Sequence, residues 1–156
     1  MKVNFSNFMI PSIFTIVLCV FSLLSSGCKK KEEPLIIEKT TFRAIPGARA
    51  GAAFLTITNK NEKPVFLQGA TFELAGRVEI HDHIIEKNGV AKMVTIHALE
   101  IPAAQKNAPG VVELKRGGKH LMLFDLDPKI FDVKELKGTL NFSFGPPVHV
   151  VFTKDK

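Results

Sequence analysis

Two methionines stand near histidines in the part of this chain that follows its apolar N-terminal segment. Met122 lies two residues after His120, and Met93 lies twelve residues after His81. Methionine commonly serves as a flexible filler of hydrophobic cores, but its thioether is also a soft ligand that suits Cu(I). Imidazole binds several transition metals, copper included. The association of both methionines with histidines therefore predicts a soft-metal site, with copper as the favoured ion.

The first candidate segment is a predicted β-hairpin. Residues 78–85 alternate in a strand-like pattern that places His81 and His83 on one face. Asn88-Gly89 favours a tight hairpin turn. We expect the return strand to carry Met93 close to the histidine pair.

The second candidate segment is a later strand. His120 and Met122 are two residues apart, so a strand places imidazole and thioether on one face. Gly117-Gly118 precedes them and allows a sharp turn into the strand. His97 and His149 have no methionine near them in the sequence, and we expect both to be ordinary surface histidines.

The N-terminus is predicted to be a lipoprotein signal peptide over residues 1–27. Lys2 precedes an apolar stretch at 8–24, and small residues follow. Leu24-Ser25-Ser26-Gly27-Cys28 resembles a bacterial lipobox, although Ser25 stands where an apolar residue is usual. Cys28 is then the lipidation site, which predicts an exported protein anchored to a bacterial membrane and facing the periplasm. An uncleaved membrane helix is the alternative.

Composition restricts the remaining possibilities. The chain has 21 Lys and Arg against 15 Asp and Glu, and part of this excess lies at residues 29–31, beside the predicted anchor, where it suits anionic headgroups. No basic stripe with interleaved aromatic residues occurs, so nucleic-acid binding is not expected. Cys19 leaves with the leader and Cys28 carries the lipid, so methionine supplies the only sulfur for a metal site.

The chain after the leader is predicted to be a short tether (28–36) followed by one domain (37–156). Short runs with period two, broken by Gly, Asn or Pro, predict an all-β antiparallel sandwich or barrel. Residues 98–110, rich in Ala and Pro, are expected to form a long loop. The expected strands cover residues 53–58, 65–72, 78–85, 92–96, 111–114, 121–124, 139–144 and 148–152.

These segments also resemble the periplasmic copper chaperone PCu(A)C family over roughly residues 48–152. The resemblance implies a cupredoxin-like Greek-key β-sandwich that binds Cu(I) and is not an enzyme. It further implies a monomer that delivers copper for assembly of the CuA centre of cytochrome c oxidase, with an oxidase subunit or its assembly factor as recipient. The motifs that carry it are Arg-Val-Glu-Ile-His (77–81), Ala-Lys-Met (91–93), Glu-Ile-Pro-Ala (100–103), Val-Glu-Leu-Lys-Arg-Gly-Gly-Lys-His-Leu-Met-Leu (112–123) and the strand 53–59.

Carried over by position, the family's Cu(I) ligands correspond to His81, Met93, His120 and Met122. This chain departs from the family at Asp82, where a methionine is usual; His83 follows it and is left open as an auxiliary ligand. The spacing between Met93 and His120 is also longer than usual in the family, with the excess in the predicted surface loop.

Other functions remain open at this stage. The same site would serve copper buffering or resistance, and binding of Cu(II) as well as Cu(I) is undecided. A zinc hydrolase would use His81, His83 and His120 with Glu79 or Asp82 as base. A lipid-anchored structural protein without a metal is the last alternative. The sequence does not distinguish the inner from the outer membrane.

Overall fold

The computed structural model describes residues 34–155; the predicted leader, Cys28 and most of the predicted tether lie outside them. No helix within the described range is long and apolar enough to cross a membrane. The strands are β1 (Ile36–Arg43), β2 (Ala50–Asn59), β3 (Val65–Phe72), β4 (Ala75–Ile85), β5 (Ala91–Ile96), β6 (Leu99–Ile101), β7 (Gly110–Leu114), β8 (His120–Leu126), β9 (Glu135–Phe142) and β10 (Val148–Lys154), and a short 3-10 helix, η2 (Pro128–Phe131), precedes β9.

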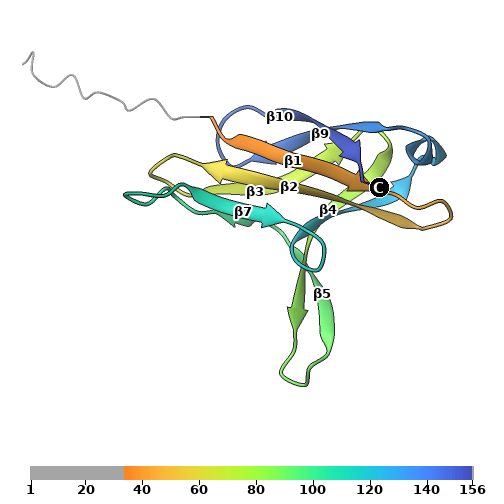
Figure 1. Cartoon of the computed structure of the whole chain (residues 1–156), viewed down its shortest axis with the longest axis horizontal. Coiled ribbons are helices and arrows are strands. Elements are labelled where there is room, and N and C mark those ends of the chain that lie inside the picture. Colours follow the sequence, from red (N-terminus) through yellow and green to blue (C-terminus); the bar gives the residue numbers. More distant parts are fainter. Residues whose placement is uncertain (1–33, 156) are drawn as a thin grey trace, which may run out of the picture. The chain divides into compact units, whose positions relative to one another are not determined.

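Seven strands close into a barrel in the order β4-β8-β2-β1-β10-β9-β3 (Figure 1). The barrel closes where β3 meets β4, through the pairing of Phe72 with Ala75. Neighbouring strands run antiparallel except β1 and β10, which pair in parallel. The remaining strands extend this sheet, with β5 paired to β4, β6 to β3 and β7 to β2. Leu99 and Ile101 of β6 and Leu114 of β7 contribute to the hydrophobic core. The predicted all-β, cupredoxin-like fold is confirmed.

Side-chain alternation separates the core from the candidate ligands within β8. Leu121 and Leu123 are fully buried in the barrel interior. His120 and Met122 occupy the alternate positions and therefore point to the outer face of the same strand. The inward-facing leucines thus anchor β8 in the core, and the outer face of the strand presents His120 and Met122.

Two strands were not predicted from the sequence, and each has a local reason. In β1, Lys39 adopts a φ of 52°, and the register against β2 shifts between Glu38 and Thr41, which interrupts the period of two. Residues 98–110 were expected to be a loop, but their start forms β6, which pairs with β3. Three residues are too few to show alternation, so the loop prediction was wrong for Leu99–Ile101.

β4 and β5 extend beyond the barrel as a hairpin, which we call the arm (residues 82–94). β4 pairs with β8 only as far as His81, and from Asp82 onward its only strand partner among residues 34–155 is β5. Figure 1 shows the arm projecting from the barrel. Its turn is closed by hydrogen bonds between Glu86 and Val90 and from Gly89 N–H to the Glu86 carbonyl. Gly89 has a φ of 81°, so the turn uses the left-handed conformation that glycine tolerates best.

Candidate metal centre

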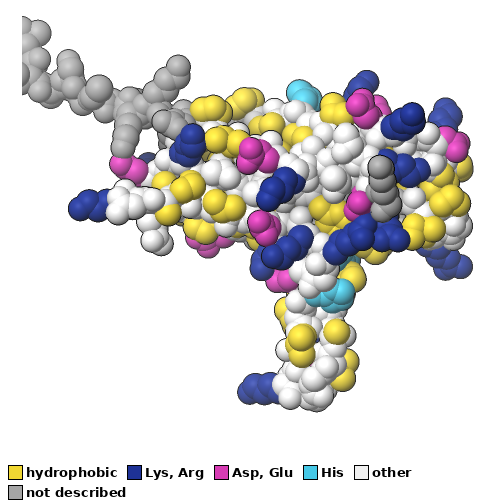
Figure 2. Space-filling model, in the orientation of Figure 1, with side chains coloured by type: hydrophobic (Ala, Val, Ile, Leu, Met, Phe, Trp, Pro, Cys, Tyr) yellow, Lys and Arg dark blue, Asp and Glu magenta, His cyan; other side chains and the backbone are white. Residues whose placement is uncertain are grey.

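The predicted ligands come together on the outer face of the sheet where the arm leaves the barrel. His81 on β4 pairs directly with His120 on β8, and the ring centroids are 5.9 Å apart. Met122 pairs with Glu79 one row closer to the barrel, and Met93 pairs with His83 one row out along the arm. The four strand positions therefore share one face, with the two histidines in the middle row. Figure 2 shows histidine side chains gathered at the base of the arm.

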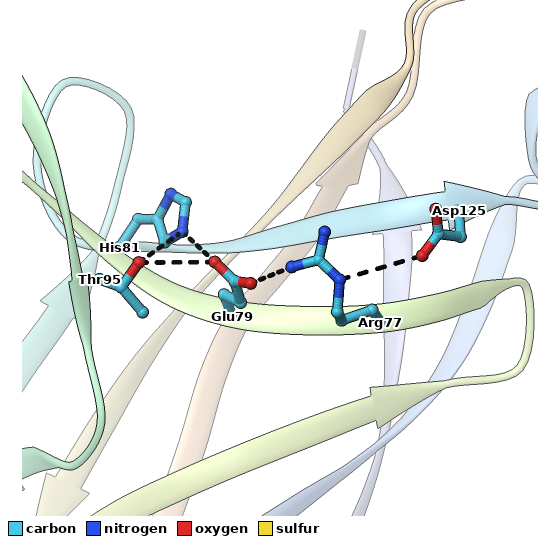
Figure 3. A network of polar contacts seen from close by, with 5 residues as sticks. All are labelled: Arg77, Glu79, His81, Thr95 and Asp125. Atoms are coloured by element: carbon cyan, nitrogen blue, oxygen red, sulfur yellow. Dashed lines mark hydrogen bonds and ion pairs between the residues drawn. The ribbon is translucent and has the colours of Figure 1, made fainter.

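His81 has two ring nitrogens in contrasting surroundings. Its Nε2 lies 2.8 Å from Oε2 of Glu79 and 3.4 Å from the hydroxyl of Thr95 (Figure 3). A carboxylate only accepts hydrogen bonds, so Nε2 carries the proton and donates it to Glu79. The other nitrogen, Nδ1, is buried and has no hydrogen-bond partner within residues 34–155. In the neutral ring, Nδ1 is then a lone-pair donor without a protein partner.

His120 is held by a different contact. Its Nδ1 lies 2.8 Å from the carbonyl oxygen of Gly118, so Nδ1–H is the donor and Nε2 carries the lone pair of the neutral ring. This backbone contact comes from the turn before β8, where Gly117 has a φ of 72°. The sharp turn predicted at this glycine pair thus also orients the imidazole.

The histidine pair fits a bound metal ion. Two rings that share an ion through metal–nitrogen bonds of about 2 Å can have ring centres up to a little over 6 Å apart. The ring centres of His81 and His120 lie 5.9 Å apart, and those of His83 and His120 lie 6.3 Å apart, near this upper limit. His81 and His120 are also buried, at 8% and 6% exposure, whereas the side chain of His83 is exposed. Spacing and burial together favour His81 with His120 over His83 with His120 as the imidazole pair of a metal site.

The two methionines flank this pair from opposite sides. Rows of one sheet face are about 7 Å apart along a strand, so Met93 and Met122 each lie about that far from the histidine row. Met93 is 42% exposed on the arm, whereas Met122 is half-buried against the barrel. A methionine side chain is long and flexible, so both thioethers can lean toward the middle row. The convergence that the sequence predicted is compatible with this face of the sheet.

Aromatic side chains border the histidine row. Phe54 on β2 lies 6.4 Å from the ring of His120, and Phe124 on β8 lies 6.0 Å from the ring of His81. Sequence reasoning did not identify either residue. Phe124 continues the alternation of His120 and Met122 and could have been found from it, whereas Phe54 comes from a strand remote in sequence. Their rings reduce the access of water to the imidazoles.

Glu79 joins the histidine row to a charged network on the barrel. Its other carboxylate oxygen forms an ion pair with Arg77. The guanidinium of Arg77 lies 4.0 Å from the ring centre of Phe124 and 3.9 Å from a carboxylate oxygen of Asp125. The hydrogen bond from His81 and the charge of Arg77 lower the pKa of Glu79 below its ordinary value of 4.5. Glu79 is therefore a carboxylate near neutral pH, able to accept from His81.

Asp82 and the histidines outside the centre have separate roles. Asp82, which alternation places on the opposite side of β4 from His81, forms an ion pair of 3.1 Å with Lys119. This contact ties the base of the arm to the residue before His120. His97 is exposed, and His149 on β10 is exposed and lies 3.0 Å from the hydroxyl of Thr139.

The zinc-hydrolase alternative loses its geometric support. Within residues 34–155 no group of three His, Cys, Asp or Glu side chains is arranged to hold a metal ion. The suggested bases are otherwise engaged, Glu79 with His81 and Asp82 with Lys119.

Comparison with known proteins places this domain in a defined class. A family model for LpqE-like lipoproteins matches residues 35–153, so the chain belongs to the LpqE-like family. A comparison with curated protein sequences gave no significant match.

Solved structures of PCuAC domains share the fold, which confirms the resemblance inferred from the motifs. The solution structure of Cu(I)-bound DR1885 from Deinococcus radiodurans is 29% identical, with a TM-score of 0.59 and 85% of each chain covered. The copper-bound PCuAC domain from PmoF2 is 18% identical, with a TM-score of 0.63, covering 80% of this chain and 94% of that one. The apo PCuAC domain from PmoF1 is 23% identical, with a TM-score of 0.60, covering 80% and 95%.

Proposed function

We propose that this protein is an extracytoplasmic copper chaperone that binds Cu(I) through His81, Met93, His120 and Met122. The observation that carries the proposal is the facing pair His81 and His120, each with one lone-pair nitrogen, set between two methionines on one face of the sheet. The likeness to Cu(I)-bound DR1885 supports copper as the ion. His83, which pairs with Met93 on the arm, is proposed only as an auxiliary ligand, because the family resemblance carries ligation onto His81.

The chemistry of this ligand set suits a carrier. Two thioethers and two neutral imidazoles bring no negative charge, and they match the softness of Cu(I) better than the tetragonal preference of Cu(II). Methionine cannot be lost to disulfide formation in an oxidising compartment, as cysteine can. Copper at the base of the exposed arm is reached from solvent on the Met93 side. We propose that an acceptor replaces Met93 first and the buried imidazoles last.

The location and recipient complete the proposal. Lipidation at Cys28 would hold the domain at a bacterial membrane surface, a placement in keeping with the LpqE-like lipoprotein family. We propose delivery to the CuA centre of cytochrome c oxidase, through an oxidase subunit or its assembly factor.

Deleting the gene should lower oxidase activity, and added copper should restore it. Unchanged activity combined with copper sensitivity would instead indicate buffering or resistance.

Metal binding itself is tested by Cu(I) titration in competition with a chromophoric chelator. The unaltered protein should bind one Cu(I), and the double substitution Met93→Leu with Met122→Leu should abolish binding, because leucine keeps the size but removes the sulfur. His149→Ala is the matched control, since it removes a histidine far from the centre and should leave affinity unchanged. Full affinity in the double variant would overturn the proposed ligand set, and no binding by the unaltered protein would favour a structural role.

A further inference from the structure

We infer that Glu79 is a positioning residue that fixes His81 in the tautomer with a free Nδ1, so that His81 and His120 bind copper through different nitrogens. His81 would coordinate through Nδ1 and His120 through Nε2. The inference rests on the proposed copper site and deepens it, by assigning the coordinating atoms and the residue that selects one of them.

The assignment for His81 follows from its two contacts and its one missing contact. The carboxylate of Glu79, 2.8 Å from Nε2, holds the proton on that nitrogen. Thr95 on β5 approaches the same nitrogen at 3.4 Å and Oε2 of Glu79 at 3.5 Å, so the polar contacts converge on one side of the ring. Nδ1 is buried without a hydrogen-bond partner among the described residues. A buried polar atom without a partner costs free energy unless a ligand fills that place, and a bound metal ion would do so.

Glu79 is itself fixed from the barrel side. Arg77 pairs with its second oxygen, and the guanidinium is held over the ring of Phe124 and near Asp125 (Figure 3). The carboxylate therefore cannot turn toward the metal without giving up contacts on both oxygens. This restraint makes Glu79 an orienting group for the imidazole rather than a ligand. A carboxylate on the far nitrogen also makes a coordinating imidazole more basic.

His120 reaches the opposite arrangement through the backbone. The carbonyl of Gly118 accepts a hydrogen bond from Nδ1–H, which leaves Nε2 available to the metal. One imidazole is thus oriented by a replaceable side chain and the other by the main chain. Substitution of Glu79 therefore removes the contact that orients His81 while leaving both histidines and the backbone contact of His120 in place.

The test is long-range ¹H–¹⁵N correlation NMR on the full domain, without metal and with one equivalent of Cu(I), which is diamagnetic. In the metal-free protein we expect the proton on Nε2 of His81 and on Nδ1 of His120. Cu(I) should then shift the resonances of Nδ1 of His81 and Nε2 of His120. Coordination of His81 through Nε2 would overturn the inference while leaving the proposed function intact. Absence of any Cu(I) binding would instead overturn the proposed function.

The variant Glu79→Gln tests the positioning role directly. Its amide can donate to Nε2 and so favour the other tautomer, which we expect to weaken Cu(I) binding by about 10–100-fold, the range typical of outer contacts to metal ligands. Glu79→Asp keeps the acceptor and should recover part of the affinity. Glu113→Gln on β7, where Glu113 pairs with Lys115, is the matched control and should change neither measurement. An unchanged tautomer and affinity in Glu79→Gln, with the fold intact by circular dichroism, would overturn the inference.

Discussion

The barrel and the arm carry different parts of the proposed centre, and they differ in how their strands are stabilised. Strands of the barrel pair on both sides and bury an apolar interior, so His120 and Met122 are fixed by Leu121 and Leu123 behind them. The arm is a two-stranded ribbon that carries Met93 and has exposed apolar side chains at Ile85 and Val90. Isolated hairpins are only marginally stable. If the proposed centre binds copper, we expect the barrel residues to hold the ion rigidly and the arm, through Met93, to govern its entry and release.

The largest expected contrast is in stability, between an aliphatic side chain of the barrel and one of the arm. Leu123→Ala removes a fully buried side chain and should lower the free energy of unfolding by about 2–5 kcal/mol. Ile85→Ala removes a side chain that is 78% exposed and should change it by no more than about 0.5 kcal/mol. Urea denaturation followed by circular dichroism measures both. Similar losses in the two variants would show that the arm is part of the cooperative core.

Two glycines offer a second contrast of the same kind. A Cβ at Gly138 would lie 2.7 Å from the ring of Phe72 inside the barrel, so Gly138→Ala should cost about 1–3 kcal/mol of global stability. A Cβ at Gly89 meets nothing within 4 Å, but the φ of 81° strains any other residue. We therefore expect Gly89→Ala to leave the melting temperature nearly unchanged and to speed amide exchange at the Glu86–Val90 turn. Unchanged exchange would mean that the turn does not depend on glycine.

Loss of a ligand from each half should have unequal effects on copper. His120→Ala removes a buried, pre-oriented imidazole and should weaken Cu(I) binding by at least about 10–100-fold, the range that outer contacts alone span. Met93→Leu removes the exposed thioether and should act mainly by speeding dissociation. The rate of Cu(I) transfer to a chelator, measured by stopped flow, distinguishes faster dissociation from weaker equilibrium binding. Slower release from Met93→Leu would contradict an arm that gates exchange.

The smallest expected effect is the pH dependence contributed by Glu79. Its pKa is lowered by the hydrogen bond from His81 and by Arg77, so its stabilising contribution is present above the ordinary value of 4.5 and is lost as pH falls through the lowered value. The difference in unfolding free energy between the metal-free protein and Glu79→Gln should therefore be largest above pH 4.5 and shrink on further acidification. Urea denaturation at about pH 7 and pH 3 checks the sign. A difference that grows toward low pH would contradict it.

The sequence predicted more of the arm than of the centre it serves. Alternation placed His81 and His83 on one face, and the Asn88-Gly89 turn brought Met93 opposite His83, because both signals are local. The pairing of His81 with His120 joins β4 to β8 across many residues, and no local pattern encodes which strands become neighbours. The motif resemblance supplied that information. The contacts that fix each imidazole depend on side-chain geometry and became evident only in three dimensions.

The parallel contact between β1 and β10 has a consequence for biogenesis. Thr41 lies beside Thr153, so the earliest and latest strands of the domain are neighbours, and the cylinder cannot shut until the final segment has emerged from the ribosome or the export channel. Pairing of such distant segments is slow to nucleate. No cysteine occurs between residues 34 and 155, so nothing covalent can secure a half-finished assembly. Under the proposed function, the barrel wall that carries His81 and His120 would belong to a closed cylinder only after β10 has been made.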